Sequence, residues 1–308
     1  MKIMVVGGAG FIGSHLADGL VKAGHAVSVV DNLFLGKREN LPDTVEFYKV
    51  DASLYHRMYA AIIAVKPDVI FNLAVLPLPH SLVDPYRNVE ANIRIVNNLC
   101  CLLQQGKYYG RLIHFSSSEV YGSAQYEPMC EKHPIEPSTP YAASKAAGDF
   151  ICSSYIKTFG CDITIIRPFN NYGERQNGGS YAGVIPLTIQ RLREGKVPII
   201  YGSGKQTRDY IYVGDTVRAA QMVLGRDDLG GQIFNIASGH DVSIGWIIQE
   251  IQELMGTDEK VLYQPERAGD VRRHIANTLR AKDILHFEHK IGMKEGLKKT
   301  IDWYLAQK

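Results

Sequence analysis

The sequence predicts an α/β fold in which helices cover both faces of a parallel sheet. Short β-branched segments alternate with amphipathic ones over the first two-thirds of the chain, and the strand candidates IMVV, VIFNLA and ITIIR are almost continuously apolar. Continuous apolar strands are typical of parallel sheets, which are buried on both faces. The alternation then indicates a doubly wound sheet with right-handed crossovers. We expect strands at residues 2–7, 26–31, 45–51, 68–74, 111–117 and 162–167, and helices at 12–23, 54–65, 86–105 and 141–158.

The alternation ends after Arg167, where Gly, Pro and Asn gather in RPFNNYGERQNGGS. Shorter elements follow, which indicates a smaller α/β lobe toward the C-terminus. We expect one domain at residues 1–172 and a second lobe made mainly of residues 173–308. Residues 233–237 are apolar again, so we expect part of the segment 208–240 to complete the main sheet.

The composition argues against several classes of protein. The formal net charge is +2, so there is no charge excess that would indicate nucleic acid or a membrane surface as partner. No apolar stretch reaches the roughly 20 residues that span a bilayer. The five cysteines form no CxxC pair and no zinc-like spacing with histidine, so we expect no metal site. Their odd number, without a signal-peptide pattern, predicts reduced thiols and a cytoplasmic protein.

A glycine motif, GGAGFIG at residues 7–13, lies where the first strand meets the first helix. Glycine lets the backbone turn sharply there and approach a pyrophosphate at the helix N-terminus. Asp31 closes the second strand, 18 residues after Gly13. A carboxylate at this point accepts hydrogen bonds from the adenosine ribose and repels a 2′-phosphate. The sequence therefore predicts a Rossmann-type site for NAD rather than NADP, although Lys37 and Arg38 leave a phosphate contact open.

Tyrosine and lysine lie four residues apart in YAASK, at Tyr141 and Lys145. Residues four apart share a helix face, and an ammonium beside a phenol lowers the pKa of the phenol from about 10. Tyr141 is therefore a candidate base near neutral pH. The segment FSSSEVYG follows the fifth strand candidate, at the sheet edge where catalytic groups of open α/β sheets gather.

Together, the glycine motif, YAASK and FSSSEVYG resemble the extended short-chain dehydrogenase/reductase family, in particular its nucleotide-sugar epimerases, dehydratases and decarboxylases. The resemblance covers essentially the whole chain and implies an NAD-dependent enzyme that oxidises a UDP- or dTDP-linked sugar at C4. It implies a catalytic set of Ser117, Glu119, Tyr141 and Lys145. Besides Tyr141 and Lys145, the implied cofactor contacts are Gly7, Gly10, Phe11, Ile12, Gly13, Asp31, Asn32, Asp51, Ala52, Leu73, Ala74, Asn92 and Pro168.

The resemblance also implies where the substrate binds. RPFNNYG, TRDYIYV and PERAGD match family segments that hold the sugar diphosphate and the nucleotide ribose, and forked guanidinium donors suit phosphate oxygens. Family members are commonly homodimers joined through two helices per subunit, here residues 86–105 and 141–158. The implied substrate contacts are Ser118, Asn170, Arg208, Arg267 and Asp270.

Two segments depart from the family pattern. AVLPLPHSLVDP, after the fourth strand candidate, is rich in proline and about a residue shorter than common family versions, and NIRIVNN stands where many relatives have a Gly-Thr pair. The first segment is expected to shape the sugar pocket. His80 lies within it and could touch the substrate, but we expect a solvated loop histidine.

Glu119 is the residue that discriminates between the possible sugar reactions. In an extended segment positions 117 and 119 point the same way, so we expect its carboxylate to face the same pocket as Ser117. Dehydratases and decarboxylases of the family usually carry Glu here, whereas epimerases carry a small or hydroxyl residue. Ser118 replaces the Asp that many dehydratases use as acid. A salt-bridged carboxylate at the sheet edge is the structural alternative.

We therefore expect a UDP- or dTDP-hexose dehydratase first. A nucleotide-sugar 4-epimerase of the UDP-glucose or UDP-N-acetylglucosamine type is the alternative, followed by a UDP-glucuronate decarboxylase. A non-enzymatic NAD-binding sensor is disfavoured, because a sensor has no need of a phenolate.

Overall fold

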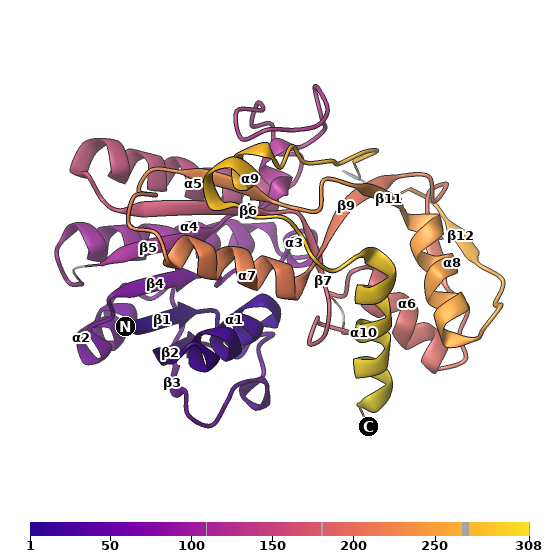
Figure 1. Cartoon of the computed structure of the whole chain (residues 1–308), viewed down its shortest axis with the longest axis horizontal. Helices are drawn as coiled ribbons and strands as arrows, with labels where there is room; N and C mark the ends of the chain where they lie inside the picture. The colour runs from indigo at the N-terminus through magenta and orange to yellow at the C-terminus, as the bar shows by residue number, and fades with distance from the viewer. Residues whose placement is uncertain (109, 180, 267–270, 308) are drawn as a thin grey trace.

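A seven-stranded parallel sheet forms the centre of the computed structural model, which describes residues 1–108, 110–179, 181–266 and 271–307 (Figure 1). Its strand order is β10-β6-β5-β4-β1-β2-β3, and every neighbouring pair is parallel. The chain starts in the middle of the sheet, builds outward to β3 and then crosses to β4 on the other side of β1. This confirms the doubly wound, Rossmann-type prediction. The strands are β1 (Lys2–Val6), β2 (Ala26–Asp31), β3 (Glu46–Lys49), β4 (Val69–Asn72), β5 (Arg111–Phe115), β6 (Ile163–Pro168) and β10 (Ile233–Ile236).

Helices cover both faces of this sheet. On one face α1 and α7 pack against each other over a core that includes Leu16 and Val223, and α9 adds to it. On the other face α2, α4 and α5 enclose a second core with Met58 and Cys152. Among the described residues, no helix is long and apolar enough to cross a membrane. The helices are α1 (Phe11–Lys22), α2 (Tyr55–Val65), α4 (Pro85–Gln104), α5 (Pro140–Phe159), α7 (Val213–Leu224) and α9 (Leu279–Leu285).

Local sequence fixes the start of the two longest helices. Asp84 caps α4 by accepting a hydrogen bond from the backbone N of Arg87 at 3.1 Å, and the Thr139 hydroxyl caps α5 by accepting from Ala142 N at 3.1 Å. A proline follows each cap at the first helical position, where its missing N–H costs nothing. The cap of α5 therefore sets Tyr141 in the first turn of its helix.

The smaller lobe is built on short strands and three helices, shown at the right of Figure 1. The order β11-β9-β7 forms one sheet and β12-β8 a second. Tyr172, Ile189, Ile247 and Leu297 belong to its core. The elements are β7 (Asn170–Tyr172), β8 (Ile199–Tyr201), β9 (Thr207–Tyr212), β11 (Asp241–Ser243), β12 (Leu262–Gln264), α6 (Val184–Arg193), α8 (Ile244–Met255) and α10 (Met293–Ala306).

The second half of the chain contributes to both lobes. The predicted return to the main sheet is confirmed, because β10 pairs with β6 in parallel register. Helices α7 and α9 also pack on the main sheet. The division between residues 172 and 173 stays a prediction.

Candidate active site

A cleft of about 1590 Å³ runs along the carboxyl edge of the parallel sheet. Residues that follow β1, β2, β4, β5 and β6 line it on one side, and residues of α6, β9 and α10 line it on the other. Doubly wound proteins bind ligands at this edge, where the strand order reverses. Here the reversal falls between β1 and β4. Among the described residues, no cluster of His, Cys, Asp and Glu is suited to a metal ion.

The glycine motif forms a cradle in this cleft. Gly7 has a φ of +79°, and a Cβ there would lie 2.5 Å from the backbone nitrogen of Ala74. A Cβ on Gly13 would collide with the carbonyl oxygen of Gly7. Gly10 is the N-cap of α1 and has no side chain that could cap the first turn. The backbone N–H groups of that turn can therefore donate hydrogen bonds to a pyrophosphate. The close backbone packing therefore fits a dinucleotide.

Asp31 holds the glycine loop against β2. One carboxylate oxygen accepts a hydrogen bond from Ala9 N at 3.0 Å, and the other accepts from Leu33 N at 2.8 Å. Burial raises the pKa of this carboxyl, and the two hydrogen bonds oppose the rise. Asp31 lines the cleft, so it has a structural part as well as the position expected of a ribose ligand. Its contact with ribose stays a prediction.

Most of the other predicted cofactor contacts also reach the cleft. Asn92 does not line it: its side chain is 3% exposed and binds the backbone N and O of Leu76 at 2.8 and 3.2 Å and the Ser144 hydroxyl at 3.0 Å. Asn92 therefore supports the loop after β4, and its direct contact with the cofactor stays a prediction. The predicted residues that line the cleft are Gly7, Gly10, Phe11, Ile12, Gly13, Asp31, Asn32, Asp51, Ala52, Leu73, Ala74, Tyr141, Lys145 and Pro168.

Tyr141, Lys145 and Ser117 come together in the cleft as predicted. Ser117 lies close enough to Tyr141 that its hydroxyl lowers the pKa of the tyrosine. The Lys145 ammonium is buried and donates to the carbonyl oxygen of Phe115 at 2.6 Å, which ties α5 to the end of β5. The tyrosine and the serine are therefore placed to share one oxygen of a bound alcohol.

The pKa of Tyr141 differs from the sequence prediction. Burial and then the carboxylate of Glu119 raise it to about 12, and the hydroxyl of Ser117 opposes this rise. Burial also lowers the pKa of Lys145 to about 8, opposed by the charge of Asp149 one turn along α5. The expected lowering of the tyrosine pKa is therefore wrong for the chain by itself, because desolvation is the largest effect on this phenol.

Glu119 lines the cleft, but not for the reason given by the sequence. Ser117 is extended, with φ −158° and ψ 151°, whereas residues Ser118–Tyr121 form a 3-10 turn, η2. The Ser117 hydroxyl caps this turn by accepting from Glu119 N at 3.2 Å. The expected alternation of an extended segment is therefore wrong here. The carboxylate nevertheless lies near Tyr141, as its effect on the pKa of that tyrosine indicates.

The predicted substrate residues fall into two groups. Ser118, Asn170 and Arg208 line the cleft, and the Asn170 amide donates to the carbonyl oxygen of Asp209 at 3.3 Å. Asn170 and Arg208 lie on the adjacent strands β7 and β9. Arg267 and Asp270 lie outside the described residues, so their predicted contacts stay predictions.

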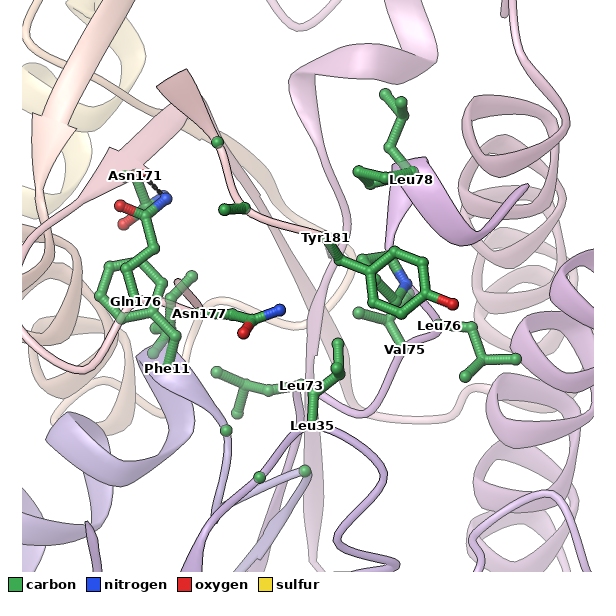
Figure 2. Close-up of a pocket in the computed structure, with 18 of the residues that line it drawn as sticks. Phe11, Leu35, Leu73, Val75, Leu76, Leu78, Asn171, Gln176, Asn177 and Tyr181 are labelled. Carbon is green, nitrogen blue, oxygen red and sulfur yellow. Dashed lines mark hydrogen bonds between the residues drawn. The ribbon is translucent and has the colours of Figure 1, made fainter. Parts of the chain in front are cut away.

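The structure adds cleft residues that the sequence did not single out. They come from the Gly-rich segment after β7, the loop after β2 and the end of α10, and examples are Phe34, Tyr181 and Trp303. Figure 2 shows Tyr181 projecting into the pocket together with Gln176 and Asn177. The glycines of RQNGGS indicate a loop here, but they do not by themselves predict that its side chains enter the cleft.

His80 also differs from expectation. It lies in the one-turn helix α3 (Leu78–Ser81) and is 5% exposed, so it is not a solvated loop histidine. Its ring contacts those of Phe34 and Tyr181.

The fold and the cleft define an NAD-dependent enzyme of the extended short-chain dehydrogenase/reductase class. Residues 3–237 match the model of the NAD dependent epimerase/dehydratase family, and the chain belongs to this family. A UDP-glucose 4-epimerase of Mycolicibacterium smegmatis is 34% identical over 316 residues, covering 99% of this chain and 98% of the relative.

Two solved structures illustrate how closely the fold is shared. The UDP-glucose 4-epimerase of Thermotoga maritima with UDP-glucose superposes with a TM-score of 0.95 at 32% identity, covering 99% of each chain. A dTDP-glucose 4,6-dehydratase of Streptomyces venezuelae with NAD bound gives a TM-score of 0.93 at 28% identity, covering 100% of this chain and 98% of the other. The family thus includes both reactions on one fold.

Proposed function

We propose that the protein is a nucleotide-sugar 4-epimerase that acts on a UDP-linked hexose. The observation that carries the proposal is that Ser117, Tyr141 and Lys145 line the same cleft, with Ser117 close enough to Tyr141 to lower its pKa. Such a pair can hold a sugar hydroxyl and move its proton. Full-length similarity to proteins named UDP-glucose 4-epimerase supports the epimerase over the dehydratase, and this reverses the order suggested by Glu119.

In this proposal the side chains of the chain position the sugar and transfer a proton. Tyr141, once ionised, takes the proton of the C4 hydroxyl, and Ser117 hydrogen-bonds the same oxygen. NAD, held by the glycine motif and Asp31, would supply the hydride acceptor for the oxidation and the donor for the reduction at C4. Inversion at C4 requires that the ketone present its other face before reduction, so the sugar turns within the cleft while the diphosphate stays bound.

We assign the diphosphate to Arg208 and Asn170. Both line the wall of the cleft that the smaller lobe provides, opposite the glycine cradle. The guanidinium of Arg208 donates to the carbonyl oxygen of Thr207 at 2.9 Å, which fixes its direction along β9. A forked cation held in this way suits phosphate oxygens.

A dehydratase is the second candidate, and Glu119 is the observation that favours it. Its carboxylate lies in the cleft and acts electrostatically on Tyr141, so it is near the reacting sugar. In a dehydratase, Glu119 would take the acidic C5 proton of the 4-keto sugar, and Ser118 or a water molecule would give a proton to the C6 hydroxyl, which then departs as water. In an epimerase, the same carboxylate would orient the sugar.

Product analysis separates the two candidates. Purified holoenzyme is incubated with UDP- and dTDP-hexoses in D₂O, and the products are examined by mass spectrometry and NMR. An epimerase gives a product of unchanged mass with inverted C4 and no deuterium at C5. Loss of water, with C5 exchange that the Glu119→Gln variant lacks, would replace the epimerase by the dehydratase.

We also propose a homodimer through α4 and α5. These helices pack against each other on one face of the sheet, and their outer side exposes Tyr86 (76%) and Phe150 (61%). Large exposed apolar side chains on two helices that pack together would be covered in such an interface.

A further inference from the structure

Three aromatic side chains from three separate segments meet beside the cleft, and two of them, Phe34 and Tyr181, line it. Phe34 belongs to the loop after β2, His80 to α3 after β4, and Tyr181 to the segment between β7 and α6. The ring centroids are 5.6 Å apart for Phe34 and His80, 6.2 Å for Phe34 and Tyr181, and 5.9 Å for His80 and Tyr181. The Arg87 guanidinium lies 5.9 Å from the Phe34 ring centroid. We call Phe34, His80 and Tyr181 the aromatic bridge.

The topology places this bridge over the glycine cradle. In the sheet order, β1 lies between β2 and β4, and the glycine motif follows β1. A contact from the loop after β2 to the helix after β4 therefore passes across the end of β1. The loop carrying Phe34 is also tied to the motif, because Lys37 N donates to the Ala9 carbonyl oxygen at 3.0 Å.

Tyr181 extends the bridge to the smaller lobe. The base of its segment is anchored to α1 by the ion pair of Arg175 and Asp18 at 2.7 Å. From this base Tyr181 projects into the pocket, on the side where Val75 and Leu76 lie (Figure 2). Its ring then contacts the two rings contributed by the sheet domain. The bridge thus joins both walls of the cleft.

We propose that the aromatic bridge is a gate for the cofactor: Phe34, His80 and Tyr181 close over the pyrophosphate of NAD and must separate before the dinucleotide enters or leaves. Contacts between aromatic rings are individually modest, so they can part without unfolding the loops. A closed gate keeps the reduced cofactor in place between the two hydride transfers of one turnover. The inference rests on NAD dependence and not on which sugar reaction the enzyme performs.

Exchange kinetics test the gate without any sugar substrate. Release is measured on NAD-loaded protein by adding excess alcohol dehydrogenase and ethanol, which convert released NAD to fluorescent NADH. Entry is measured by stopped-flow mixing of cofactor-free protein with NAD. Because opening limits entry, the observed rate in the native protein should level off at high NAD concentration. Phe34→Ala and Tyr181→Ala should each remove this plateau and speed release roughly tenfold, as expected from losing two ring contacts.

Two further variants serve as controls. Tyr181→Phe retains the ring and should restore slow exchange. Tyr263→Ala removes a tyrosine that is 61% exposed on β12, outside the cleft lining, and should leave both rates at the native value. Circular dichroism melting verifies that each variant is folded. If Phe34→Ala does not fold, the result for Tyr181→Ala decides the test. An unchanged rate of NAD release in the alanine variants would overturn the gate. Faster NAD release with an unchanged rate of NAD entry would also overturn it, because the rings would then only contact bound NAD and not block its path.

Discussion

Tyr141 shows how one side chain depends on everything placed around it. Its position in the first turn of α5 follows from the Thr139 cap, but its pKa of about 12 follows from burial in the cleft and from Glu119. A phenol with this pKa is not a base near neutral pH. A positive charge in the cleft must therefore stabilise the phenolate during catalysis. Lys145 can supply this charge, because it lies on the same face of α5 as Tyr141.

Replacing Tyr141 tests this assignment. Tyr141→Phe retains the ring and removes the proton acceptor, so turnover should fall by roughly 10²–10⁴, the loss typical of a general base. The affinity for free UDP, measured by calorimetry, should stay within twofold of the native value, roughly the scatter of a neutral substitution. Near-native turnover in this variant would remove Tyr141 from the mechanism.

The pKa of Lys145 predicts how folding stability and catalytic activity depend on pH. Its pKa in the folded chain is lowered to about 8 from the model-peptide value of 10.5, so the folded chain holds fewer protons than the unfolded chain between these values. Stability therefore gains from this group as pH rises from about 8 to 10.5, whereas the ammonium needed beside Tyr141 is lost.

We expect kcat/KM to decline above pH 8. In Lys145→Arg, whose guanidinium stays charged, the decline should disappear; a decline retained in that variant would assign it to another group.

At the scale of elements, a buried ion pair joins α5 to β6. Asp149 and Arg167 are each 2% exposed at the side chain and lie 2.9 Å apart, and Arg167 also donates to the Tyr121 hydroxyl at 2.9 Å. Burial removes both charges from water, so each depends on its partner. The pair fixes α5, which carries Tyr141 and Lys145, against the strand that ends at Pro168.

Asp149→Asn should lower the free energy of unfolding by about 3–5 kcal/mol, because it leaves the Arg167 charge buried without its carboxylate. Urea denaturation measures this change. The matched control is Glu295→Gln, which breaks an exposed pair with Lys299 on α10 and should cost less than about 1 kcal/mol. Equal costs for the two substitutions would show that the buried pair does not hold α5 in place.

At the scale of the whole molecule, the two lobes form the cleft together, and the proposed homodimer would join two copies through α4 and α5. Phe150→Asp places a charge on the exposed face of α5, and we expect it to convert the dimer to a monomer in size-exclusion chromatography with light scattering. Leu305→Asp, on α10 and 51% exposed, should remain dimeric. A native protein that elutes as a monomer would contradict the proposed interface.

The sequence by itself determined the features that depend on local backbone and periodicity. Apolar strands alternating with amphipathic helices predicted the parallel sheet, and the glycine motif and YAASK predicted which loop and which helix line the cleft. These predictions hold because both features depend on local geometry. A sharp turn needs glycine wherever it occurs, and residues four apart share a helix face in any fold.

Only the tertiary structure decided the environment of those residues. The 3-10 turn at Glu119, the burial of His80, the place of Asn92 beneath the loop after β4 and the pKa of Tyr141 all depend on segments far away in the chain. The aromatic bridge is the clearest case, because its three rings are separated by more than forty residues and meet only when β2, β4 and the smaller lobe are assembled. Desolvation and long-range contact have no local sequence pattern, so they appear only once the chain is folded.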